Sequence, residues 1–176
     1  MIDIRQVDES LARELSELCA NSFAGAYHGV NSQADIEAYC EKNYSIAKVK
    51  ANLSNPDVLY KVSYRDSKAV GFFMVQNQQC PKELDGNVLE LKQIYVLASE
   101  FGTGLGKQLL DAVIHYANQQ HKKWIWLSVS DLNARAQSFY LKHGFEKMGT
   151  APLLEVGSDR LPATLMALRL AGDAWR

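Results

Sequence analysis

The sequence has few cysteines, and they form no recognisable pattern. Cys19, Cys40 and Cys80 lie far apart, and their odd number leaves one thiol unpaired in any disulfide scheme. The 4 histidines are equally scattered, and none belongs to an H-x-x-x-H pair. We therefore expect no metal site, and we interpret the cysteines as free thiols of the core or the surface.

A strong excess of charge and a long apolar run are also absent. Lys and Arg total 19 against 20 Asp and Glu, a formal net charge of −1, so nucleic acid and anionic membranes are not the expected partners. No run approaches the roughly 18 apolar residues of a membrane span, and the start lacks the basic and then apolar pattern of a signal peptide. We expect a cytoplasmic protein with small-molecule partners. The sequence leaves its oligomeric state open, a homodimer included.

The 176 residues contain no internal repeat and no low-complexity segment, and they predict one domain over residues 1–176. Alternating or continuous apolar residues predict strands at residues 2–7, 58–64, 70–75, 88–97, 124–129, 145–148 and 164–170. Helical spacing predicts helices from Ser10 toward Phe23, from an N-cap at Ser32, at residues 46–53, from Leu105, and at residues 133–141.

The strand at residues 124–129 is nearly all apolar, as is typical of a central strand covered on both faces. The preceding helix is long enough to connect it in parallel to the strand at residues 88–97. The order of elements therefore predicts an α/β fold with a mixed sheet.

The segment from Phe101 to Lys107 reads F-G-T-G-L-G-K and lies between a predicted strand and an amphipathic helix. A helix start leaves backbone N–H groups unpaired, and glycines let an anion approach them, so this loop predicts binding of the pyrophosphate of a nucleotide-derived cofactor. It fits neither the Rossmann fingerprint, because it reads G-x-G-x-G in mid-chain, nor the Walker loop, because Gln108 follows Lys107. A tight turn from strand to helix is the alternative explanation of the glycines.

A second motif, N-x-x-A-x-x-F-Y-x-K-x-G-F, runs from Asn133 to Phe145 directly after the predicted central strand. Together with the glycine loop it resembles the GNAT superfamily of acetyl-coenzyme A (acetyl-CoA) dependent N-acetyltransferases, most closely the branch with bacterial spermidine/spermine-type enzymes. The similarity covers about residues 88–145 firmly and the N-terminal helices more loosely. It implies a single GNAT-like domain, a mixed central sheet with splayed central strands flanked by helices, and acetyl-CoA as co-substrate.

The resemblance implies a set of residues that hold acetyl-CoA. The backbone of Tyr95 and Val96 would bond the pantetheine arm, and the Val96 N–H would stabilise the oxyanion of the tetrahedral intermediate. Asn133 would bond the pantetheine from the other splayed strand, and Lys142 would approach the adenosine phosphate. The pyrophosphate would lie on Gly102, Thr103, Gly104, Leu105, Gly106 and Lys107.

Two residues are candidates for proton transfer. The resemblance places Tyr140 as the general acid, because a thiolate leaving group needs a proton donor within reach; packing of a core aromatic beside Phe139 is the alternative. Glu90 is a candidate base for the attacking ammonium, directly or through water, and a solvated carboxylate at a strand edge is its alternative.

The acceptor amine is expected between the N-terminal helices and the splayed strands. Tyr27, His28 and Tyr39 are candidates for holding an ammonium together with Glu90, by charge and cation–π contact. Simple capping of the core by the two tyrosines is the alternative.

The sequence departs from the family pattern at three places, and these departures bear more on the acceptor than on the cofactor. Phe101 replaces the usual Arg or Gln, Ser130–Asp131 replaces Trp-Glu, and Ala163 replaces an acidic residue. We expect acetyl transfer to a primary amine of a small molecule such as a polyamine, by direct attack in a ternary complex. The alternatives are a peptide, protein or antibiotic amine, and a non-catalytic acyl-CoA-binding module.

Overall fold

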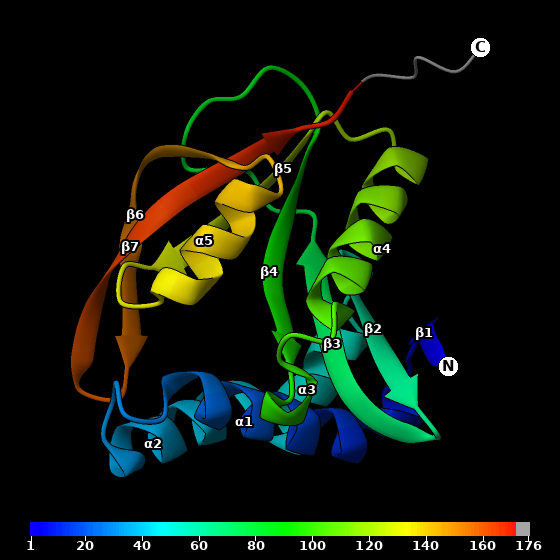
Figure 1. Ribbon diagram of the computed structural model, residues 1–176, viewed down its shortest axis with the longest axis vertical. Helices are drawn as coiled ribbons and strands as arrows, with labels where there is room; N and C mark the ends of the chain where they lie inside the picture. Colours follow the sequence, from blue (N-terminus) through cyan, green and yellow to red (C-terminus); the bar gives the residue numbers. More distant parts are fainter. Residues whose placement is uncertain (172–176) are drawn as a thin grey trace.

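The computed structural model describes residues 1–171 as a mixed seven-stranded sheet between two groups of helices (Figure 1). Within these residues the strand order is β1-β2-β3-β4-β5-β7-β6, and only β4 and β5 pair in parallel. The strands are β1 (Ile2–Gln6), β2 (Val58–Arg65), β3 (Lys68–Gln76), β4 (Val88–Val96), β5 (Trp124–Ser130), β6 (Glu146–Val156) and β7 (Asp159–Arg169). The helices are α1 (Ala12–Tyr27), α2 (Gln33–Tyr44), α3 (Ile46–Leu53), α4 (Leu105–Gln119) and α5 (Ala134–Lys142), with 3₁₀ turns η1 (Glu9–Leu11) and η2 (Ala98–Glu100).

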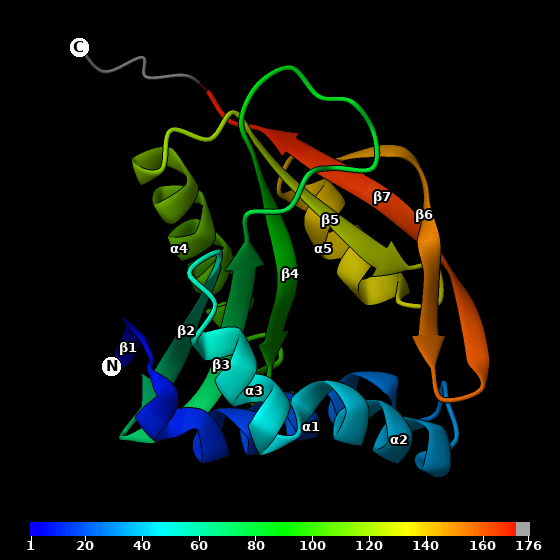
Figure 2. The ribbon, with the colours of Figure 1, turned by 180° about the vertical axis from the view of Figure 1, so that it is seen from behind.

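Each face of the sheet has its own hydrophobic core. Helices α1–α3 cover one face, where Phe23 and Val49 pack with Tyr60 and Phe72 (Figure 2). Helices α4 and α5 cover the other face, where their apolar side chains pack against β3, β4 and β5. Helices on both sides of a sheet that holds parallel and antiparallel pairs confirm the predicted α/β fold with a mixed sheet.

Several local predictions are confirmed in detail. Helix α3 spans the predicted residues 46–53. Ser32 caps α2, because its hydroxyl accepts from the Asp35 N–H at 3.1 Å. The β2–β3 hairpin turns at Asp66 and Ser67, whose φ angles of 49° and 65° are those of a two-residue turn with a left-handed backbone.

The last two strands are longer than predicted. We expected residues 145–148 and 164–170, whereas β6 and β7 have 11 residues each. Register shifts between Lys147 and Gly149 and between Ala151 and Leu154 interrupt the alternation of β6. These shifts interrupt the period-2 signal of β6, so the sequence pattern revealed only its start.

The turn between β6 and β7 is tied to the region around α2. The Asp35 carboxylate accepts from the Ser158 N–H at 2.9 Å, and the Asn31 amide donates to Asp159 Oδ2 at 2.8 Å. Gly157 adopts a φ of +60°, and a Cβ there would collide with the Asp35 side chain. Figure 2 shows α1 and α2 extending across the sheet to reach this turn.

Two further features of residues 1–171 bear on function. None of their helices combines the length and the apolar character needed to cross a bilayer. They also contain no grouping of three or more His, Cys, Asp or Glu side chains able to ligate a metal ion.

Candidate active site

Strands β4 and β5 separate partway along their length and leave a slot in the sheet. They pair only from Val88 with Trp124 to Glu90 with Trp126, so residues 91–96 of β4 have no partner on β5. In the pairing of β3 with β4, Met74 and Val75 lie opposite residues on either side of Lys92, which itself has no partner. This bulge lies where β4 separates from β5. Figure 1 shows the two strands moving apart below this point. The backbone groups along the slot are therefore free to bind a ligand.

Two cavities meet at the slot. The larger has a volume of 530 Å³ and lies between α1, α2, α5 and β4. The smaller has a volume of 440 Å³ and lies beside β5 and the start of the 77–87 loop. Glu90 and Lys92 line both cavities. Of the predicted site residues, the larger cavity is lined by Tyr27, Tyr39, Glu90, Tyr95, Val96, Gly106, Asn133 and Tyr140.

The glycine loop presents backbone donors at the start of α4. Gly102 and Gly104 have φ angles of +79° and +85°, and a Cβ would meet no atom within 4 Å at either position. Among the hydrogen bonds of residues 1–171, none is donated by the N–H of Gly102, Gly104, Gly106 or Lys107. Left-handed glycines and unpaired N–H groups at a helix start form a cradle for an anion. The loop therefore fits the pyrophosphate of acetyl-CoA.

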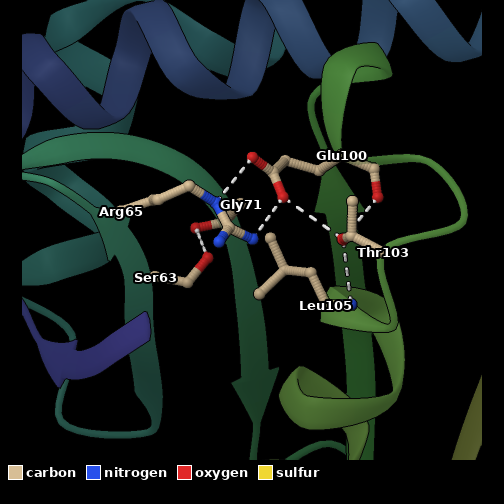
Figure 3. Close-up of polar contacts among 6 residues, drawn as sticks. All are labelled: Ser63, Arg65, Gly71, Glu100, Thr103 and Leu105. Atoms are coloured by element: carbon tan, nitrogen blue, oxygen red, sulfur yellow. Dashed lines mark hydrogen bonds and ion pairs between the residues drawn. The ribbon is translucent and has the colours of Figure 1, made fainter. Parts of the chain in front are cut away.

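A buried carboxylate anchors this loop to the neighbouring hairpin (Figure 3). Arg65 of β2 donates two bonds to Glu100, from Nε at 3.1 Å and from a terminal nitrogen at 2.8 Å. The Thr103 hydroxyl donates to the Glu100 carbonyl at 2.8 Å and accepts a longer bond from the Leu105 N–H at 3.4 Å. Thr103 thus stabilises the loop from inside, and the Arg65 guanidinium holds the pKa of Glu100 below its usual value.

Of three cationic side chains near the glycine loop and on α5, one lines the larger cavity. The Lys107 ammonium lies 2.6 Å from Asp111 one turn along α4, and Lys142 is exposed and does not line the cavity. Arg135 of α5 lines the cavity, and its guanidinium carbon lies 3.4 Å from the centre of the Phe101 ring. A cation on an aromatic face is stabilised there. Arg135 therefore supplies a positive charge at the start of the glycine loop.

Tyr140 and its neighbours form a polar group inside the cavity. Burial, and to a smaller degree the hydroxyl of Tyr27, raise the pKa of Tyr140 well above its usual value. Burial also raises the pKa of Tyr27, while the nearby side chains of Tyr95 and Asn133 act in the opposite direction. Asn133 Oδ1 caps α5 by accepting from the Ala136 N–H at 3.0 Å, which leaves its amide nitrogen as a donor. Tyr140 is therefore held in its protonated form, as a proton donor must be.

Glu90 lies where the two cavities meet, with 4% of its surface exposed. The Gln76 side-chain amide, from the neighbouring strand, donates to Glu90 Oε2. The Lys92 ammonium lies 3.4 Å from Glu90 Oε1. The carboxylate is thus buried and held by one amide and one cation, in contrast to the solvated edge position that was the alternative.

The three predicted acceptor residues do not lie together. Tyr27 and Tyr39 line the larger cavity, and each stacks on Phe23, with ring centres 4.4 Å and 4.1 Å apart. Burial is the main cause that raises the pKa of Tyr39 to about 12. His28 is exposed at the end of α1 and lines neither cavity. The structure therefore brings the two tyrosines toward the slot and leaves His28 outside it.

Sequence reasoning missed three polar residues of the site. Arg135 lies inside the second motif, but helical spacing does not show which face of α5 it occupies. Lys92 and Gln76 come beside Glu90 through a bulge and a strand register that no sequence pattern specifies. A charged residue two positions from a candidate base was the one available signal for Lys92.

Comparison with known proteins agrees with the glycine loop, the splayed strands and the second motif. The Acetyltransferase (GNAT) family matches residues 20–145. An uncharacterised N-acetyltransferase of Lactobacillus delbrueckii subsp. lactis is 26% identical over 160 residues, which are 90% of this chain and 92% of that protein. A spermidine N(1)-acetyltransferase of Thermoplasma acidophilum is 28% identical over 152 residues, 82% of this chain and 88% of that protein.

Solved structures show the same architecture. The crystal structure of an N-acetyltransferase from Thermoplasma acidophilum in complex with coenzyme A has a TM-score of 0.81 and 25% sequence identity, and the match covers 97% of this chain and 99% of that one. The family match, the relatives and the shared fold give one answer: the chain belongs to the GNAT family and is an acetyl-CoA-dependent N-acetyltransferase.

Proposed function

We propose that the protein transfers the acetyl group of acetyl-CoA to a primary amine of a small molecule, by direct attack in a ternary complex. The observation that carries this proposal is the slot between β4 and β5, because it joins a cavity beside the glycine loop to a second cavity lined by Glu90. Two substrates can then meet in the slot from the two cavities. A polyamine is one candidate acceptor, since one relative is a spermidine N(1)-acetyltransferase.

The chain's own groups would bind acetyl-CoA along the larger cavity. The N–H groups from Gly102 to Lys107 would hold the pyrophosphate, assisted by the charge of Arg135. The free backbone edge at Tyr95 and Val96 would bond the pantetheine arm from one side, and the amide nitrogen of Asn133 from the other. Lys142, exposed on α5, remains a candidate for the adenosine phosphate.

The reaction needs three proton transfers around one substitution at the thioester carbon. Glu90, directly or through water, takes a proton from the ammonium, and the neutral amine then attacks and forms the new C–N bond. The Val96 N–H would stabilise the oxyanion that results. When the C–S bond breaks, the thiolate takes the proton of Tyr140, and the nitrogen gives up its remaining extra proton, which restores the Tyr140 hydroxyl and leaves a neutral amide. Tyr27 and Tyr39, which line the larger cavity, are proposed to hold the amine near the slot, whereas His28 lines neither cavity and has no proposed role.

Release of free thiol from acetyl-CoA in the presence of a panel of amines tests this proposal. We expect thiol release that depends on the amine, together with an acetylated product of matching mass. If acetyl-CoA binds but no amine, peptide or amine-bearing antibiotic increases thiol release, the chain is an acyl-CoA-binding module and the proposed transfer is wrong.

Glu90→Gln tests the base. The amine must lose a proton before it attacks, so we expect turnover of this variant to require a higher pH or to be lost, with acetyl-CoA affinity nearly unchanged. Rate measurements from acid to alkaline pH, with calorimetry of cofactor binding, check both parts. Glu146→Gln, an exposed carboxylate of β6, serves as the matched control. A wild-type pH–rate profile for Glu90→Gln would show that deprotonation occurs elsewhere.

Glu100→Gln tests the anchor of the glycine loop. We expect the KM for acetyl-CoA to rise by about 3- to 10-fold with little change in kcat, because a buried charge-assisted contact is lost far from the reacting atoms. Steady-state kinetics measure the split. Since Arg65 lowers the pKa of Glu100, the contact is present above the usual glutamate pKa and is lost as the pH falls through the lowered value.

Glu155→Gln is the matched control for the loop anchor, since it removes an exposed ion pair with Arg160 at 3.7 Å. We expect its kinetics to equal those of the wild type. An unchanged KM for acetyl-CoA in Glu100→Gln would show that the loop keeps its shape without the anchor.

A further inference from the structure

We propose that the acceptor is a compact amine that carries a carboxylate next to its amino group, of the α-amino acid type, and that the site discriminates against polyamines. The inference rests on the proposed function and specifies its substrate class. Its basis is the small number of charged side chains along the two cavities and the way in which the single carboxylate among them is paired.

The cavities offer little negative charge to a polycation. Among the described residues, the charged side chains of the larger cavity are Glu90, Lys92 and Arg135, and those of the smaller cavity are Glu90 and Lys92. One carboxylate therefore faces two cations. A polyamine would bring several ammonium groups into these cavities, and all but one would lack an anionic partner. Two of the residues that depart from the family pattern, Ser130 and Ala163, line the smaller cavity and add no negative charge to it.

Glu90 is already engaged by both of its oxygens. Gln76 donates to one, and the Lys92 ammonium lies 3.4 Å from the other. An acceptor ammonium that approaches Glu90 therefore also approaches Lys92. At similar distances, repulsion by the Lys92 ammonium offsets much of the attraction by the Glu90 carboxylate. A simple cation therefore gains little binding energy from Glu90 and Lys92 together.

A carboxylate on the acceptor removes this conflict. With its ammonium against Glu90 and its carboxylate against Lys92, each of the four charges has an opposite neighbour. In an α-amino acid, a single carbon atom lies between the amino group and the carboxylate. The two charged groups are therefore close enough to contact Glu90 and Lys92 together, since the Lys92 ammonium lies 3.4 Å from Glu90 Oε1. The Lys92 side chain is 50% exposed and lies at the bulge of β4, so its ammonium is free to turn toward a ligand.

The remaining surroundings also suit a small polar molecule. The smaller cavity has a volume of 440 Å³ and is lined by three neutral amide side chains, Gln76, Gln78 and Gln79. Side-chain amides donate to carboxylates and accept from ammonium groups without adding charge. Cavities of this size hold compact ligands. An internal segment of a peptide has no free backbone carboxylate, and it is not a compact ligand for a cavity of this volume.

The test compares matched acceptors with the wild-type enzyme. Thiol release is measured with the standard amino acids, and the best of them is then compared with its carboxamide, with its decarboxylated amine and with spermidine. We expect kcat/KM for the amino acid to exceed that for its carboxamide by about 10-fold or more, since removal of the carboxylate leaves Lys92 unpaired. Equal use of acid and carboxamide, or better use of spermidine, overturns the inference and leaves the proposed transfer intact.

Charge reversal at Lys92 gives a second, independent measurement. Lys92→Glu is expected to lose the amino acid as substrate and to gain activity toward spermidine, while acetyl-CoA affinity stays within about 2-fold. Lys68→Met, an exposed lysine of the β2–β3 hairpin that lines neither cavity, is the matched control. If Lys92→Glu binds acetyl-CoA normally and keeps the acceptor preference of the wild type, Lys92 has no part in specificity. If the wild type binds acetyl-CoA and acetylates no amine at all, the proposed function itself is wrong.

Discussion

Tyr140→Phe is expected to lower kcat by about 100-fold, the usual contribution of a positioned general acid. The variant keeps the aromatic ring and its contacts with Phe139 and Phe145, whose ring centres lie 5.5 Å and 5.4 Å from that of Tyr140. It removes the hydroxyl proton, which burial keeps in place at neutral pH by raising the pKa of Tyr140. The thiolate must then leave without a proton donor, so the loss falls on turnover and not on cofactor affinity.

Steady-state kinetics and calorimetry with acetyl-CoA distinguish these two effects. Tyr116→Phe is the matched control, because Tyr116 is a partly buried tyrosine of α4 that lines neither cavity. We expect that control to behave as the wild type. A fully active Tyr140→Phe enzyme would mean that Tyr140 acts only in packing.

Gly104→Val is expected to weaken acetyl-CoA binding by about 10- to 100-fold. The backbone of Gly104 has a φ of +85°, where a β-branched residue costs about 1–2 kcal/mol. The new side chain would also stand at the start of α4, where the unpaired N–H groups are proposed to bind the phosphates. Both effects reduce the affinity of the loop for an anion, and calorimetry measures their sum.

The control for Gly104→Val separates phosphate binding from backbone strain. Gly149 has a φ of +130°, and a Cβ there would also meet no atom within 4 Å, but it lies in β6. Gly149→Val is expected to lower the melting temperature without weakening acetyl-CoA binding. Unchanged affinity in Gly104→Val would remove the phosphate cradle from the account of this site.

The sequence predicted those parts of the fold that depend on local signals. The Ser32 cap, the limits of α3 and the glycine loop before α4 each follow from residues within one or two turns of each other. The full lengths of β6 and β7 did not follow, because bulges shift the side-chain alternation that marks a strand.

The site residues also divide into those that a local motif predicts and those whose contacts depend on the packing of distant elements. Asn133 and Tyr140 lie seven positions apart on one motif, and both line the larger cavity. The contacts of Glu90 with Gln76 and Lys92 depend on how β3 pairs with β4, and the placement of Arg135 over Phe101 depends on how α5 packs beside the loop. Interactions between elements distant in sequence are set by tertiary packing, which a single sequence does not display. His28 was included by its proximity to Tyr27 in the sequence, although the end of α1 directs it outward.

The contact between Asp35 and the β6–β7 turn has a mechanical consequence for the slot. The two parts of the sheet are joined by a backbone ladder at one end, from Val88 to Glu90, and beyond the slot by side-chain bonds from Asp35 and Asn31. A ladder of backbone bonds is rigid, whereas exposed side-chain bonds open and close readily. Any widening of the slot that admits or releases a substrate would therefore pivot at the ladder and begin with the opening of the Asp35 contact.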